Sequence, residues 1–202
     1  MLHSCCSCWR RKKASSITRA TTNGQRLKKG CRSSVVILDE CIDRLVRIAL
    51  YQPDIPQNTG TILRLCACLN VEAHIIEPAG FPVSDRHFRR AGMDYLDQVR
   101  IVRHDSWTKF EQWRHSERLR LVLFSTRGAL PYLDYRYTTS DILLFGRESA
   151  GVPDEVIAAA DARLVIPIAP GLRSLNVAMA SAMALGEALR QTASGDNGIS
   201  RQ

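Results

Sequence analysis

Short apolar runs alternate with amphipathic stretches between residues 46 and 191. Six runs rich in Val, Ile, Leu and Phe have the length and composition of buried strands; they cover 46–51, 73–77, 99–102, 119–124, 141–145 and 164–168. Apolar residues at helical spacing predict helices over 59–69, 84–91, 106–115, 153–160 and 174–191. Strands that alternate with helices are typical of a parallel sheet covered on both faces. The pattern therefore predicts an α/β fold.

The two ends of the chain lack this pattern. Residues 1–44 are polar, basic and rich in Ser and Thr, which is typical of a disordered extension, and residues 193–202 form a polar tail. We therefore expect one domain over residues 45–192. An Arg-rich, acid-poor start also fits an organelle presequence, and translation that begins near Val46 is a third interpretation of the same residues.

Positive charge is concentrated in the N-terminal extension. The 202-residue chain has a formal net charge of +8, but nine of its 28 Lys and Arg residues lie in residues 1–34, which contain no Asp or Glu. The remainder carries 19 basic and 20 acidic side chains. An argument for nucleic-acid binding by the domain must therefore rest on local patches. No apolar run reaches the roughly 18 residues of a membrane span, so we expect no membrane association.

Cysteine usage favours a cytoplasmic protein. The chain has seven cysteines, an odd number in a domain large enough to bury its own core, so reduced thiols are expected rather than a disulfide framework. Cys5, Cys6 and Cys8 could bind a soft metal, but their spacing matches no standard zinc pattern. We expect no metal site in the domain. The absence of a Rossmann glycine fingerprint, a Walker loop and a Gly-x-Ser-x-Gly elbow disfavours nicotinamide-dependent oxidoreductases, nucleotide triphosphatases and α/β-hydrolases.

Three loops rich in Gly, Pro and polar residues follow apolar strands. Residues 53–60 are PDIPQNTG, residues 146–153 are GRESAGVP, and residues 166–177 are IPIAPGLRSLNV. Ligands of open α/β sheets bind at the carboxyl ends of the strands. We therefore expect one site built from these three loops.

Single residues in these loops allow two interpretations each. Arg64 could close on a phosphate held at the N-terminus of the helix after the first loop; alternatively, Asn58 is a helix cap and Arg64 a solvated side chain. Glu148 could accept a hydrogen bond from a ribose or hold a neighbouring Arg, or it could form an exposed ion pair in a turn. Ser174 is placed to cap the last helix, whereas Asn176 points to a polar contact because Asn is a weak helix former.

In this order and at these separations, the three loops resemble the three motifs of the SPOUT superfamily of RNA methyltransferases. The residues concerned are Asn58-Thr59-Gly60 with Arg64, then 145–153 and 166–177. The resemblance is greatest to the small single-domain branch, the tRNA (cytidine/uridine-34-2′-O)-methyltransferases, and covers about residues 46–191. The basic extension has no counterpart in that branch, and Arg147 stands where many relatives have Pro or Asn.

The resemblance implies a C-terminal trefoil knot, a homodimer and S-adenosyl-L-methionine as cofactor. By motif position, the residues expected to line the cofactor site are Phe124, Gly146, Ile166, Ile168 and Ser174. Arg64 is the expected catalytic residue. We expect it to remain charged, to hold a phosphate and to stabilise the developing alkoxide, because an Arg pKa exceeds about 12. The residues expected to contact the RNA are Asn58, Tyr95, Glu148 and Asn176.

The expected function is methyl transfer to the ribose 2′-hydroxyl at the wobble position of tRNA, with the anticodon stem-loop as partner. Two alternatives stay open. One is 2′-O-methylation of ribosomal RNA or of another tRNA position. The other is a non-catalytic RNA-binding dimer that keeps the fold.

Overall fold

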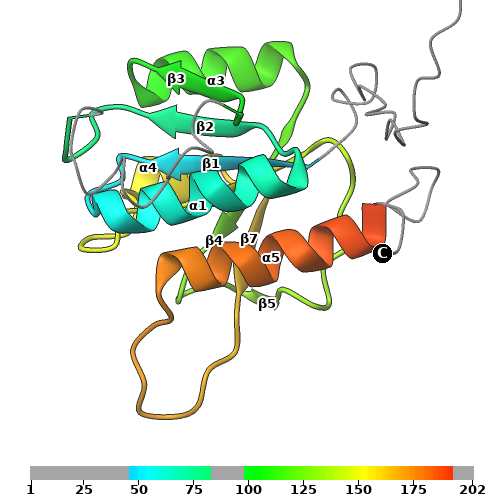
Figure 1. Ribbon diagram of the computed structural model, residues 1–202. Helices are drawn as coiled ribbons and strands as arrows, with labels where there is room; N and C mark the ends of the chain where they lie inside the picture. Colours follow the sequence, from blue (N-terminus) through cyan, green and yellow to red (C-terminus); the bar gives the residue numbers. More distant parts are fainter. Residues whose placement is uncertain (1–45, 83–97, 193–202) are drawn as a thin grey trace, which may run out of the picture. The chain divides into compact units, whose positions relative to one another are not determined.

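A computed structural model of the chain describes residues 46–82 and 98–192, which fold around a seven-stranded sheet (Figure 1). The strands are β1 (Arg47–Tyr51), β2 (Ala73–Ile76), β3 (Ile101–His104), β4 (Arg120–Phe124), β5 (Leu130–Pro131), β6 (Asp141–Phe145) and β7 (Ala162–Val165). The helices are α1 (Pro56–Leu69), α3 (Trp107–Ser116), α4 (Asp154–Ala159) and α5 (Val177–Thr192). The strand order is β3-β2-β1-β6-β4-β7-β5, and every neighbouring pair is parallel. The predicted parallel α/β sheet is confirmed.

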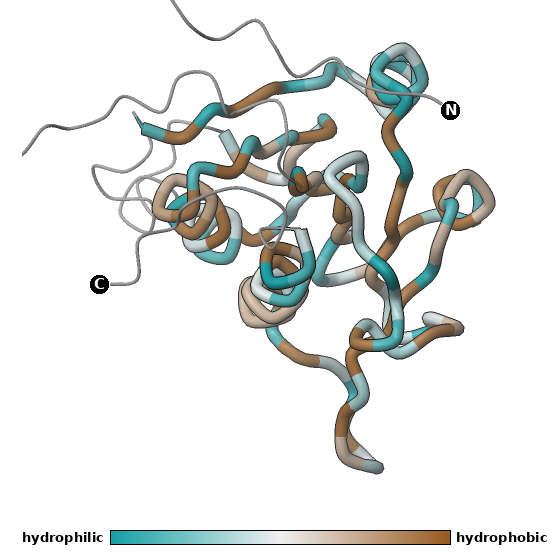
Figure 2. Tube along the Cα trace, turned by 90° about the vertical axis from the view of Figure 1, so that its right-hand side faces the viewer, coloured by the Kyte–Doolittle hydropathy of each residue, from teal (hydrophilic) through white to brown (hydrophobic). Residues whose placement is uncertain are grey.

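Both faces of the sheet are covered by helices, as the apolar runs predict. Alternate residues of a strand point to opposite faces, so Ile48 and Leu50 of β1 pack toward α1 and α5. Ala49 and Tyr51 belong to a second core, which includes Phe110 of α3 and a residue of α4. Figure 2 shows apolar, brown segments in the interior of the domain, with coiled helices on either side. No helix within the two described ranges is both long and apolar enough to cross a membrane.

Several boundaries differ from the predicted ones. Helix α1 begins at Pro56 rather than at residue 59, because proline is well suited to the first helical position, where its missing N–H costs no bond. Strand β7 ends at Val165, three residues before the predicted end, and Pro167 could not donate to a ladder there. Strand β5 has two residues and was not predicted. The predicted helix over 84–91 and both chain ends lie outside the described residues.

Residues 125–132 run along the backbone of β7 in very close contact. The amides of Ser125, Ala129 and Tyr132 donate to carbonyls of β7 over 2.9 to 3.0 Å. A Cβ atom on Gly128 would lie 2.3 Å from the carbonyl carbon and oxygen of Leu164. No side chain fits in that space, so this crossing of two chain segments requires glycine.

Two histidines are buried where β2 and β3 face α3. His74 Nδ1 lies 3.0 Å from His104 Nε2, and His74 Nε2 lies 3.0 Å from Glu72 Oε1. The rings pack against Trp113 at centroid distances of 4.3 and 5.1 Å. Burial lowers the pKa of both imidazoles, and together with the unfavourable interaction that two charged rings would have, it lowers the pKa of His104 to about 4. Both rings are therefore neutral in the folded protein at neutral pH.

Replacing His104 with glutamine is expected to flatten the pH dependence of stability. A histidine with a depressed folded-state pKa stabilises the fold fully above its unfolded pKa of about 6.5, and this stability is lost as pH falls toward the folded value. Between about pH 7 and pH 5, His104→Gln should lose about 2 kcal/mol less than wild type in urea unfolding. Equal losses in both proteins would contradict the neutral assignment of His104.

Candidate active site

The expected site lies where the strand order reverses. Strands β1 and β6 are neighbours in the middle of the sheet, and the connections that follow them lead to opposite faces. Such a switch point opens a crevice beyond the carboxyl ends of the strands. A cavity of about 810 Å³ lies there. It is lined from the β1–α1, β6–α4 and β7–α5 loops, as predicted, and also from the end of β4.

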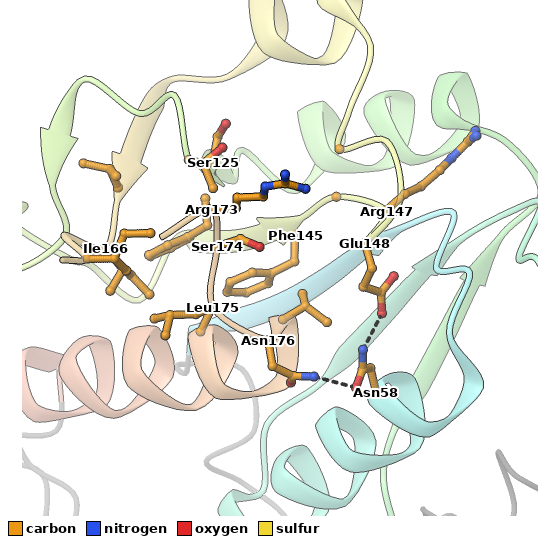
Figure 3. A pocket seen from close by; sticks show the side chains of 18 of the residues that line it. Asn58, Ser125, Phe145, Arg147, Glu148, Ile166, Arg173, Ser174, Leu175 and Asn176 are labelled. Atoms are coloured by element: carbon orange, nitrogen blue, oxygen red, sulfur yellow. Dashed lines mark hydrogen bonds between the residues drawn. The ribbon is translucent and has the colours of Figure 1, made fainter. Parts of the chain in front are cut away.

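One wall of the pocket is apolar. The rings of Phe124 and Phe145 stack with their centroids 5.0 Å apart at the ends of β4 and β6. Ile166 and Leu175 extend this wall (Figure 3). Next to it, Gly146 is essential, because a Cβ there would lie 2.8 Å from the carbonyl carbon of Gly151. The wall can hold a flat apolar ring system against a loop backbone.

The facing wall is a hydrogen-bonded row of polar side chains. Asn58 Nδ2 donates to Glu148 Oε1 over 3.2 Å, and Asn176 Nδ2 donates to Asn58 Oδ1 over 3.0 Å (Figure 3). Asn176 Oδ1 in turn accepts from the amides of Ala178 and Met179 in the first turn of α5. This row therefore joins residues that are 90 and 118 positions apart in sequence.

Two carboxyl groups beside this row have opposite pKa shifts. The Asp54 carboxylate accepts from the amides of Glu148 and Ser149 over 3.1 and 3.2 Å and from the Ser149 hydroxyl. The neighbouring Glu148 carboxyl group and these contacts lower the pKa of Asp54 to about 2. Burial, and then the neighbouring Asp54 carboxylate, raise the pKa of Glu148 to about 7. Glu148 is consequently about half protonated at neutral pH.

Residues 45–186 match the SpoU rRNA Methylase family. The matched range is most of the chain and contains every residue that lines the pocket. The chain belongs to this family.

Characterised tRNA methyltransferases are similar to this chain over nearly their whole length. A tRNA (cytidine(34)-2′-O)-methyltransferase from Beijerinckia indica is 69% identical over 144 residues, which cover 71% of this chain and 90% of the relative. A protein with the same name from Escherichia coli K12 is 38% identical over 149 residues and is covered to 94%.

Solved methylase structures share the fold. One structure, from work on 2′-OH methylation of C/U34 on tRNA, is 40% identical with a TM-score of 0.71, and the match covers 76% of this chain and 99% of that one. The SpoU methyltransferase AviRb from Streptomyces viridochromogenes, in complex with the cofactor AdoMet, is 28% identical with a TM-score of 0.68. That match covers 75% of this chain and 62% of AviRb.

The structure gathers most of the predicted site residues of this methylase around the one pocket. The lining residues among them are Asn58, Phe124, Gly146, Glu148, Ile166, Ile168, Ser174 and Asn176. Arg64 does not line the pocket; it is exposed on α1. Tyr95 lies outside the described residues, as do Cys5, Cys6 and Cys8.

Three local interpretations are wrong. Ser174 does not cap the last helix, because α5 begins at Val177 and Asn176 accepts its first amides. Asn58 is not a cap either, since it lies inside α1. Arg64 is not close to the N-terminus of α1, because it lies eight residues beyond Pro56, or about 12 Å along the axis. Glu148 accepts from Asn58, while Arg147 places its guanidinium 5.7 Å from the centre of the Tyr51 ring.

Two site residues were not predicted. Phe145 lines the pocket at the end of β6; it begins the second motif, 145–153, but it was not among the residues expected to line the cofactor site. Asp54 bonds to the β6–α4 loop, although it lies inside the first quoted loop. The sequence did show a carboxylate between two prolines at the end of a strand, which is typical of a functional loop. The amides that Asp54 binds, however, are 94 and 95 residues away.

Proposed function

We propose that this protein is a cytoplasmic tRNA (cytidine(34)-2′-O)-methyltransferase that uses S-adenosyl-L-methionine and needs no metal. The observation that carries the proposal is the 69% identity to the Beijerinckia indica enzyme over 90% of its length. The pocket supports the proposal independently, because it combines an apolar wall with a polar row at a topological switch point.

The pocket residues fit the cofactor. A volume of about 810 Å³ is in the range of cofactor sites, and the stacked Phe124 and Phe145 rings offer an apolar surface for an adenine. The backbone at Gly146 can be approached closely because no Cβ stands there. The proposed holding residues are Phe124, Gly146, Ile166, Ile168 and Ser174. When bound, the cofactor supplies an electrophilic methyl group on a positively charged sulfur.

The polar row is the proposed contact surface for the target ribose. Each Asn amide nitrogen has two hydrogens, and Asn58 and Asn176 each use one of them within the row. The remaining hydrogens and the Glu148 carboxyl group can orient sugar hydroxyls at the pocket. We propose Tyr95 as a further contact to the RNA.

A second copy of the chain is needed to complete this site in our proposal. Leu172 and Met179 are 68% and 60% exposed, and Leu175 and Met183 are each 40% exposed. This apolar surface on α5 and its preceding loop adjoins the pocket, and α1 packs against α5. Apolar patches of this kind mark interfaces. We propose a homodimer through this surface that brings Arg64 of one subunit to the pocket of the other.

Arg64 is the proposed catalytic residue. A guanidinium keeps its proton at any physiological pH and can hold a phosphate through two parallel hydrogen bonds. We propose that Arg64 fixes the phosphate next to the target ribose and stabilises negative charge as it develops on the 2′-oxygen. The hydroxyl proton then passes to phosphate or to water.

The resemblance also implies a knotted chain, and we include this knot in the proposal. The tight crossing of residues 125–132 with β7 would belong to a C-terminal trefoil knot. Knots are rare exceptions among protein topologies, and the requirement for glycine at position 128 supports such a crossing.

Methyl transfer to a single 2′-oxygen tests the function directly. We expect labelled methyl groups to enter a tRNA transcript with cytidine at position 34, and nuclease digestion with mass mapping should place them on that nucleotide. The same tRNA with 2′-deoxycytidine at position 34 should accept none. Label in ribosomal RNA instead of tRNA would favour the first alternative. RNA binding without cofactor affinity in calorimetry would favour the non-catalytic dimer.

A further inference from the structure

Asp54 links two of the pocket loops, and the backbone around Gly80 packs closely against it. Its carboxylate accepts the amides of Glu148 and Ser149 and the Ser149 hydroxyl. Behind it, the Gly80 amide donates to the Pro53 carbonyl over 2.8 Å, and a Cβ on Gly80 would lie 3.0 Å from Asp54 Cα. The Asp54 carboxylate therefore lies on a closely packed backbone, and it accepts the amides of two successive residues of the β6–α4 loop, Glu148 and Ser149.

The hydrogen bonds of the polar row all run in one donor-to-acceptor direction, which is set by the amides at the start of α5. The amides of a first helical turn can only donate, so Asn176 must turn Oδ1 toward them and Nδ2 toward Asn58. Asn58 must then accept with Oδ1 and donate with Nδ2, so Glu148 Oε1 must accept. The other oxygen, Oε2, is buried, and within the described residues it has no donor. A protonated Oε2 would need an acceptor, and the neighbouring Asp54 carboxylate, which already accepts the Glu148 amide, could supply it.

We propose that Asp54 is a positioning residue for methyl transfer: by accepting the amides of Glu148 and Ser149, it holds Glu148 and the polar row in place beside the pocket. For the reaction that it serves, this inference rests on the proposed function. Asp54 touches neither cofactor nor ribose in this scheme, and it acts through Glu148 and the β6–α4 loop.

The surroundings of Glu148 support a shared proton. The side chains that face it are Asp54 from the β1–α1 loop and Asn58 from α1. Arg147 turns away toward Tyr51, and Arg173 extends into the pocket from the β7–α5 loop (Figure 3). Asp54 is the charged group that acts on the Glu148 carboxyl, whose pKa of about 7 follows from burial and from Asp54. Above that pH, two carboxylates would meet and the loop should loosen.

Hydrogen exchange of the cofactor-free full chain tests this arrangement. Two amides of the β6–α4 loop bond directly to Asp54, so a peptide covering residues 146–152 reports on the contact by mass spectrometry. At about pH 6 we expect Asp54→Asn to exchange at least about tenfold faster there than wild type. Glu148→Gln, which imitates the protonated acid, should stay protected at about pH 6 and about pH 8.5, whereas wild type should lose protection at the higher pH.

Kinetics then test the link to the reaction. Asp54→Asn should lower kcat by about 10- to 100-fold with little change in KM for tRNA, because it misplaces a pocket loop. Asp134→Asn, an exposed aspartate outside the pocket, is the matched control and should behave as wild type. Wild-type exchange in Asp54→Asn, or lost protection in Glu148→Gln, would overturn the positioning role. Absence of tRNA methylation by the wild type would instead overturn the proposed function, while the exchange result would still decide the role of Asp54 in holding the loop.

Discussion

Replacing Gly128 with alanine should leave little folded protein. The added methyl group would lie 2.3 Å from the carbonyl carbon and oxygen of Leu164 and 2.6 Å from the amide nitrogen of Val165. These are backbone atoms of β7, so they cannot rotate away as a side-chain end would. Overpacking of this kind costs about 3 kcal/mol or more. Urea unfolding followed by circular dichroism measures the loss.

The matched control for Gly128 is another glycine of the same domain. A Cβ on Gly186, which is exposed on α5, meets no atom within 4 Å. Gly186→Ala should therefore stabilise the helix by up to about 1 kcal/mol, because alanine is the better helix former. If Gly128→Ala unfolded at the same urea concentration as wild type, residues 125–132 could not run against β7 as described.

Arg64→Ala is expected to reduce methyl transfer to tRNA by about 10²- to 10³-fold, the usual effect of removing one charge-stabilising donor. The fold should be unaffected, because Arg64 is exposed on α1. Arg64→Lys separates the two proposed roles of Arg64, which are to stabilise negative charge and to hold the phosphate. Lysine keeps the positive charge but cannot form the planar two-bond contact to phosphate. Near-full activity of Arg64→Lys would exclude the two-bond contact.

Mixing two inactive variants shows in which subunit Arg64 acts. The Arg64→Ala variant has an intact pocket, whereas a variant with a disabled pocket, Gly146→Val, has an intact Arg64. If Arg64 serves the partner's pocket, each mixed dimer has one complete site, and a randomised equal mixture should regain roughly a quarter of wild-type activity. No recovery after exchange of subunits would place Arg64 and its pocket in the same subunit.

Local patterns in the sequence were enough to predict the parallel sheet and the loops at its site. Runs such as 142–145 are apolar throughout, which is typical of a sheet buried on both faces. Because the carboxyl ends of parallel strands lie on the same side of a sheet, the glycine- and proline-rich loops that follow them were expected to lie close together. This reasoning placed Gly146, Glu148 and Asn176 correctly near one another.

Contacts between distant residues could not be predicted in the same way. Both Ser174 and Asn176 are residue types that cap helices well, and the contact that Asn176 makes with Asn58, 118 residues away, could not be foreseen from local sequence. The role of Asp54 depends on amides 94 and 95 residues further along the chain. The short strand β5 carries too little pattern to be recognised, because its two residues gain their order from β7.

The long sequence separations across the polar row have a consequence for biosynthesis. Asn58 is made early, but its neighbours Glu148 and Asn176 come from the second half of the chain. A nascent polypeptide therefore has no assembled pocket until the start of α5 has left the ribosome. Loop closure over such distances is slow compared with helix formation, so competence to bind a ligand should arise at the end of folding, together with global stability.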